Sequence, residues 1–145
     1  MAWTENLITG LAQYLAAGGV GVWRPTGVYT AGEVAIVYRA IPQTPDQVIT
    51  LAAYPIGSTN PGLADHDTAV QVRIRGTADP LVCDALADAV FDLLDSATGL
   101  SFGGVRVPQM WRQSYTSLGQ DTNNRWERSE NYYLQTMRPT VHNTD

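Results

Sequence analysis

The residues best suited to acid–base or metal chemistry are Asp65, His66 and Asp67, which follow one another in the sequence. Two carboxylates beside an imidazole can tune a general base or bind a metal ion. Adjacent side chains seldom converge on one ion, however, and the other histidine, His142, lies close to the C-terminus. We therefore expect these three residues to form a solvated loop rather than a catalytic or metal site.

Two further motifs carry weaker chemical signals. The run Gly18-Gly19-Val20-Gly21 has the glycine content of a phosphate loop. A nucleotide fingerprint follows a strand and opens a helix, however, whereas here a predicted helix precedes a predicted strand. Cys83 is flanked by Asp79 and Asp84, which disfavour a reactive thiolate, so we expect a packed apolar thiol. The sequence predicts no enzyme, no catalytic residue, no metal and no cofactor.

Length, charge and cysteine content narrow the class of protein. The chain has 145 residues, a formal net charge of −5 and one cysteine. A chain of this size suits a single domain with a proper hydrophobic core. The acidic balance argues against a groove that neutralises nucleic-acid phosphates, and no apolar run approaches the ~20 residues of a membrane span. We expect a soluble protein from a reducing cytosol, without disulfides or a membrane partner.

Periodicity predicts two helices and six strands. The first helix begins near Thr4 and ends at Gly18, whereas the second is capped by Thr77 or Asp79, has Pro80 in its first turn and runs to about residue 95. Apolar or alternating segments predict strands at residues 20–23, 35–41, 48–54, 70–75, 105–115 and 125–137. We expect the second and third strands to form a hairpin or a close pair, and residues 55–67 to form a loop.

The last two predicted strands form a long C-terminal β-hairpin with residues 116–124 as a polar, mobile tip. Together the elements predict one α+β domain over residues 1–139, with a single mixed or antiparallel sheet packed by two helices. Residues 140–145 are expected to form a flexible tail.

The charge pattern predicts a contact between copies of the chain. Arg73 and Arg75 alternate with apolar residues, which places both on the non-core side of their strand. Asp84, Asp88 and Asp92 recur every four residues on the second helix, where like charges are unfavourable in isolation. Both sets could be merely solvated. Alternatively, the arginines of one copy face the aspartates of the next in a head-to-tail contact, which is the kind that closes rings.

Arginine and aromatic residues concentrate in the same region. All nine bases are arginine and there is no lysine, which a GC-rich coding sequence explains. Codon usage does not explain why six of the nine lie on the basic strand or the hairpin, at positions 73, 75, 106, 112, 125 and 128. Cross-strand pairing accounts for some hairpin aromatics, but one core of this size cannot hide them all. We therefore expect part of the hairpin to contact another protein.

The order of several segments resembles one family. Three of them are Ala69-Val-Gln-Val-Arg-Ile-Arg-Gly76, Ala78-Asp-Pro80 and Asp84-Ala-Leu-Ala-Asp-Ala-Val-Phe-Asp-Leu-Leu94. Further segments are Pro42-Gln-Thr-Pro-Asp46, Tyr54-Pro55, Gly119-x-Asp121, Arg125, Asn131-Tyr132 and Arg138-Pro139. In this order they resemble the tail terminator or minor capsid (neck) proteins of long-tailed bacteriophages.

The resemblance implies a tail-terminator-like fold whose copies close into a ring. We expect this ring to be a hexamer. Such a ring caps the tail tube at full length, ends elongation and offers a joining surface to the head. The implied partners are further copies of the chain, the tail tube protein and the head-side connector, while genome DNA passes through the lumen without specific binding. Candidate contacts to tube or connector are Trp111, Arg112, Tyr115, Asp121, Trp126 and Arg128.

The implied location is the neck of the virion, after synthesis in the bacterial host cytoplasm. Two alternatives remain open from the sequence. One is another neck protein, such as a head-completion protein or connector adaptor, and the other is a host protein-binding module with an exposed aromatic hairpin.

Overall fold

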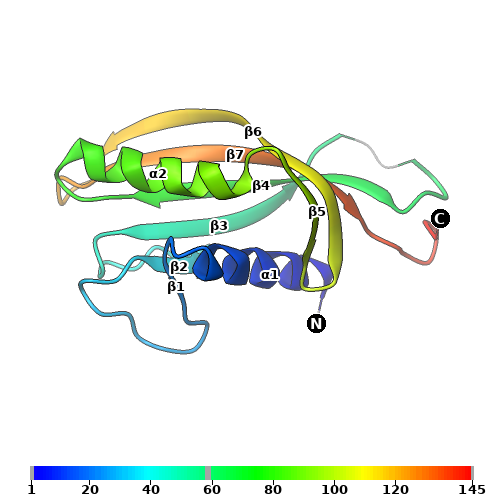
Figure 1. Ribbon diagram of the computed structural model, residues 1–145, viewed down its shortest axis with the longest axis horizontal. Coiled ribbons are helices and arrows are strands. Elements are labelled where there is room, and N and C mark those ends of the chain that lie inside the picture. The colour runs from blue at the N-terminus through cyan, green and yellow to red at the C-terminus, as the bar shows by residue number, and fades with distance from the viewer. Residues whose placement is uncertain (1, 58–59, 145) are drawn as a thin grey trace.

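The computed structural model describes residues 2–57 and 60–144. Two helices, α1 (Trp3–Ala17) and α2 (Pro80–Leu94), lie side by side on one face of a curled seven-stranded sheet (Figure 1). The strands are β1 (Val22–Trp23), β2 (Ala35–Tyr38), β3 (Val48–Pro55), β4 (Asp65–Arg75), β5 (Ala97–Phe102), β6 (Val105–Gln120) and β7 (Trp126–Met137). The predicted α+β fold, with one mixed sheet packed by two helices, is confirmed.

The strand order is β1-β2-β3-β4-β7-β6-β5. The β1–β2 and β2–β3 pairs are parallel, whereas all other pairs are antiparallel. The predicted closeness of β2 and β3 is therefore confirmed, but a hairpin between them is wrong because Ala35 lies opposite Val48 in a parallel register. Residues 39–47 carry the chain back across the end of the sheet, which brings the 42–46 turn near the tip of the β6–β7 hairpin.

The long C-terminal hairpin is confirmed, but its tip is shorter than predicted. The β6 strand continues to Gln120, which pairs with Trp126, so residues 116–120 belong to the sheet. The register shifts twice along β6, between Arg112 and Ser114 and again between Ser117 and Gly119. Each shift is a β-bulge, which bends a strand and increases its twist.

The core lies between the helices and the inner face of the sheet. On β4, Val70, Val72 and Ile74 point toward the helices and are buried, while the alternate residues form the outer face. Leu7 and Leu11 of α1 are buried against this face. Each such side chain contributes about 1.5–3 kcal/mol by leaving water, which makes this packing the main source of stability.

The ends of the helices follow their local chemistry. Asp79 caps α2 as predicted, because its carboxylate accepts a hydrogen bond from Leu81 N at 3.0 Å, and Pro80 opens the helix. The predicted Thr4 cap is wrong, since the N-cap position of α1 is Ala2, two residues earlier, and no side chain caps the helix. The helices meet where the Tyr14 hydroxyl donates to Leu93 O at 3.3 Å.

No helix of the described residues is long and apolar enough to cross a membrane.

Candidate interaction surface

Arg75 does not face solvent, contrary to the sequence prediction. It lies on the outer face of β4, but the 42–46 turn covers it and leaves the residue 3% exposed. Its guanidinium donates to the carbonyl oxygens of Pro45 and Asp46 at 2.8 Å and to that of Pro42. Burial, with Arg125 nearby, lowers the pKa of Arg75. Arg75 therefore holds the turn in place.

Arg125 holds the same turn from the hairpin tip. It is buried, and it donates to Gln43 O at 2.7 Å and to Asp121 Oδ2 at 2.9 Å. Asp121 also accepts from the backbone N–H of Asn123 and of Arg125. Burial alone would raise the pKa of Asp121, but these hydrogen bonds outweigh it and lower the pKa. We name Arg75, Arg125 and residues 42–46 the turn clamp.

A buried carboxylate organises the inner side of the hairpin. Glu130 is 0% exposed, yet its Oε1 lies 3.2 Å from Arg112 Nη1 and its Oε2 lies 3.0 Å from Arg128 Nε. The Tyr132 hydroxyl donates to Oε1 at 3.3 Å, and burial raises the pKa of Tyr132. Arg128 also donates to Asp84 Oδ1 at 3.0 Å, which ties the hairpin to α2. We name Glu130 with Arg112, Arg128 and Tyr132 the Glu130 cluster.

Tyr115 lies over this cluster and reaches solvent. The Arg128 guanidinium lies 4.1 Å and the Arg112 guanidinium 5.0 Å from the centre of its ring. Cation–π contacts of this kind fix an aromatic ring in place. Tyr115 is nevertheless 54% exposed, so it presents a preset aromatic surface.

The other predicted contact residues of the hairpin are more enclosed. The Trp111 ring meets that of Tyr133 edge-on at 6.2 Å, and Trp126 packs partly buried against the core. Arg128 and Asp121 have the internal partners described above. The roles of these residues toward a tube or connector stay predictions, and among the six only Tyr115 is mainly exposed to solvent.

The two sides of the predicted contact between copies differ in accessibility. Arg73 pairs with Glu127 at 3.1 Å, but its side chain is 39% exposed. Asp84 is bound to Arg128, while Asp88 and Asp92 are exposed on α2. The contact between copies stays a prediction, and Arg75 can take part in it only indirectly because it is buried.

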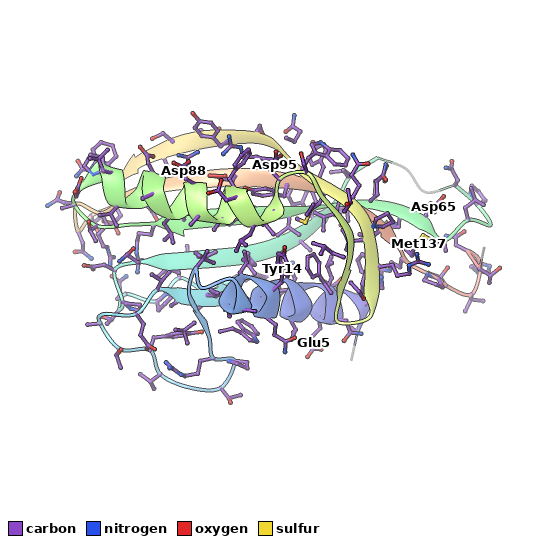
Figure 2. All side chains as sticks on the ribbon, in the orientation of Figure 1. Glu5, Tyr14, Asp65, Asp88, Asp95 and Met137 are labelled. Carbon is purple, nitrogen blue, oxygen red and sulfur yellow. The ribbon has the colours of Figure 1, made fainter. Side chains whose placement is uncertain are left out.

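The expected loop at Asp65, His66 and Asp67 is a strand. These residues open β4 and pair with the end of β7, so that Asp65 lies beside Met137 (Figure 2). The His66 ring meets Trp3 edge-on at 5.5 Å. Burial, followed by the nearby Arg138, lowers the pKa of His66. Within residues 2–57 and 60–144, no group of three or more His, Cys, Asp or Glu side chains could hold a metal ion.

Cys83 is buried, as expected for a packed thiol, and burial raises its pKa to about 11.

Sequence reasoning missed the exposed edge of β6. The β5 strand, which was also missed, pairs with β6 only as far as Met110, whereas β7 pairs with β6 to its end. Leu118 on this edge is 43% exposed. The available signal was the absence of any charged residue from Gln113 to Gln120, which is unusual for a strand at the edge of a sheet.

Comparison with known proteins places these features in a family. A chain of a virion of native gene transfer agent (GTA) particle is similar in structure, with a TM-score of 0.60 and 18% sequence identity. The match covers 94% of this chain and 98% of that chain, and at this identity it shows the shared fold alone. No curated protein sequence matches the chain. Residues 14–138 match the sequence family described as bacteriophage tail terminator protein, and the chain therefore belongs to that family.

Proposed function

We propose that this protein forms a ring at the head-proximal end of a phage tail tube, where it ends tube elongation and offers the surface that joins the tail to the head. The observation that carries the proposal is the family match over residues 14–138. The fold shared with a chain of a gene transfer agent virion supports a structural role in a particle. The protein then acts by contact and not by catalysis.

A ring requires two different surfaces on each copy, because a head-to-tail contact joins unlike patches. Arg73 lies on the outer face of the sheet, whereas α2 covers the inner face. The Arg73 side chain of one copy facing Asp88 and Asp92 of the next would satisfy this requirement. We propose a hexamer built on such contacts.

The charge of the chain suits a ring around DNA. The formal net charge of the chain is −5. An acidic channel repels phosphate and lets a duplex slide without binding. In the proposed virion, the tube protein lies on one side of the ring, the connector lies on the other, and the genome passes through the lumen.

Deletion of the gene from the producing phage or particle tests the proposal by electron microscopy. We expect tails of uncontrolled length that lack heads, and restoration of both defects by the wild-type gene. The variant Arg73→Glu should weaken ring formation in native mass spectrometry, with Arg106→Glu, an exposed arginine on β6, as the matched control. Tails of normal length that merely lack heads would contradict the capping role and favour another neck protein.

A further inference from the structure

The second half of β6 has an open edge. Asp95 Oδ1 accepts a hydrogen bond from Arg112 N at 2.9 Å, which occupies the edge just beyond the end of β5. From Gln113 to Gln120, β7 is the one strand paired with β6 in the part of the chain that the structure describes. The backbone groups on the other side of this segment are therefore available to another strand. We name residues 113–120 the β6 edge.

The β6 edge carries two bulges but lacks the other two usual protections against strand pairing, which are charged residues and prolines. Natural edge strands carry charges, prolines or bulges, but this segment contains no charged residue and no proline. Its two bulges shape the strand, and Tyr115 and Leu118 remain exposed on it. The other ends of the sheet are less accessible, since β1 has two residues and α1 lies against the end of β5, where a Cβ at Gly10 would come within 2.2 Å of Gly103 N.

Carboxylates of α2 lie along the same side as this edge. Successive residues of a helix are about 100° apart, and Leu93 marks the flank of α2 that contacts α1. Asp84 and Asp95 point to the opposite flank, where they contact Arg128 and Arg112 of the hairpin. Asp88 falls between them in sequence and lies on that flank (Figure 2). Asp92, one turn further along α2, is exposed to solvent. Asp88 and Asp92 have no cation bound to them among the ion pairs of the described residues.

We propose that the β6 edge binds an extended basic segment of a different protein, which adds as a further strand beside β6. Its backbone would pair with residues 113–120, and its basic side chains would lie against Asp88 and Asp92. The proposal rests on the proposed function in one respect: the segment belongs to a neighbouring protein of the same virion.

This chain does not supply such a segment itself. It has no lysine, and Arg75 of its alternating basic pair is buried in the turn clamp. Direct pairing of two β6 edges would join two copies by a two-fold axis, which closes a dimer and not a ring. In the proposed ring, a single Arg73 from a neighbouring copy neutralises one of Asp88 and Asp92, so the other carboxylate remains for the added strand.

Binding of a synthetic peptide to the full-length protein tests the proposal. The probe is a nine-residue peptide that alternates arginine and valine, and its control has the same sequence with every backbone amide N-methylated. The control keeps the charge but cannot donate hydrogen bonds to a strand. The protein is compared with Asp88→Asn/Asp92→Asn and with the matched variant Asp65→Asn/Asp67→Asn, which removes the same charge from exposed positions at the far end of β4. Titration calorimetry at low ionic strength gives each affinity.

We expect N-methylation to weaken binding by about tenfold or more, since several backbone hydrogen bonds are lost. We expect the α2 variant to weaken binding by about three- to tenfold, and the β4 variant to change it by less than about twofold. Equal binding of both peptides, or equal losses in the two variants, would overturn the proposal. The peptide affinities are independent of the tail length measured after gene deletion. The capping role can therefore be disproved while the β6 edge still binds the peptide, and peptide binding can be disproved while the capping role stands.

Discussion

The turn clamp and the β6 edge both lie at the tip of the β6–β7 hairpin, yet they have opposite chemistry. In the clamp, Arg75 and Arg125 are buried and their donors are bound to carbonyl and carboxylate oxygens of the same chain. Along the edge, the strand carries no charge and exposes Tyr115 and Leu118. The comparison shows that arginine content does not by itself mark a contact surface, because a guanidinium can also satisfy the backbone of an irregular turn.

The largest effect should come from the Glu130 cluster, which anchors the edge to the folded body. Replacing Glu130 with alanine leaves Arg112 and Arg128 without their buried counter-charge. We expect the free energy of unfolding to fall by about 3–5 kcal/mol, measured by urea denaturation. The exposed Glu5→Ala is the control and should cost less than about 0.5 kcal/mol. Equally small losses of unfolding free energy in the Glu130 and Glu5 variants would show that the Glu130 cluster does not stabilise the hairpin.

The clamp itself should give the next largest effect. Arg75→Met keeps the length of the side chain but leaves three backbone carbonyls without their donor. We expect a loss of about 2–3 kcal/mol in the same denaturation experiment. Arg73→Met, on the same strand face, removes a pair whose arginine side chain is 39% exposed and should cost about 1 kcal/mol or less. A larger loss of stability in Arg73→Met than in Arg75→Met would contradict the structural role of Arg75.

The edge should behave in the opposite way. Leu118→Ser changes an exposed side chain at a bulge, so we expect stability to change by less than about 0.5 kcal/mol. Its incorporation into particles should nevertheless fall, as measured by quantitative blotting of purified virions against the wild type. Normal incorporation of a stable Leu118→Ser protein would show that the β6 edge is not part of the contact surface.

The smallest effect concerns His66 at the far end of β4. Its pKa is lowered in the folded protein by burial and by Arg138, so the unfolded chain takes up a proton first as the pH falls. Stability should therefore be complete above about pH 6.5 and decrease as the pH falls through the folded pKa. NMR titration should place the His66 midpoint below 6.5, and His66→Gln should flatten the stability profile. A His66 midpoint above 6.5 would contradict the packing against Trp3.

Regular patterns in the sequence predicted most of the fold. Alternation along β4 and β7 and the Asp79-Pro80 start of α2 have local causes, so they are readable without tertiary information. The β5 strand was missed because Gly99 interrupts the alternation between Ala97 and Phe102. The strand is held by pairing with β6 and by the close approach of α1. The parallel pairing of β2 and β3 likewise depends on distant contacts.

The site was less predictable, because burial of a polar residue depends on what covers it. Alternation correctly placed Arg75 on the outer face of β4, but it could not show that the 42–46 turn lies over that position. Alternation along β7 places Glu130 on the inner face of the sheet. A carboxylate at such a position indicates either an error in the predicted register or a buried ion pair. Two arginines bind Glu130: Arg112 lies on β6, distant in sequence, and Arg128 lies on β7, the same strand as Glu130. The sequence alone does not show that either arginine pairs with Glu130.

Hydrogen–deuterium exchange in the free protein and in purified particles tests the contrast between clamp and edge most directly. We predict that peptides covering residues 113–120 exchange more slowly in particles, together with those covering the acidic flank of α2. Peptides covering residues 42–46 should exchange at the same rate in both states, because the hydrogen bonds that Arg75 and Arg125 donate to the carbonyl oxygens of this turn are internal to one chain. Unchanged exchange over residues 113–120, with new protection at the turn clamp, would contradict the account.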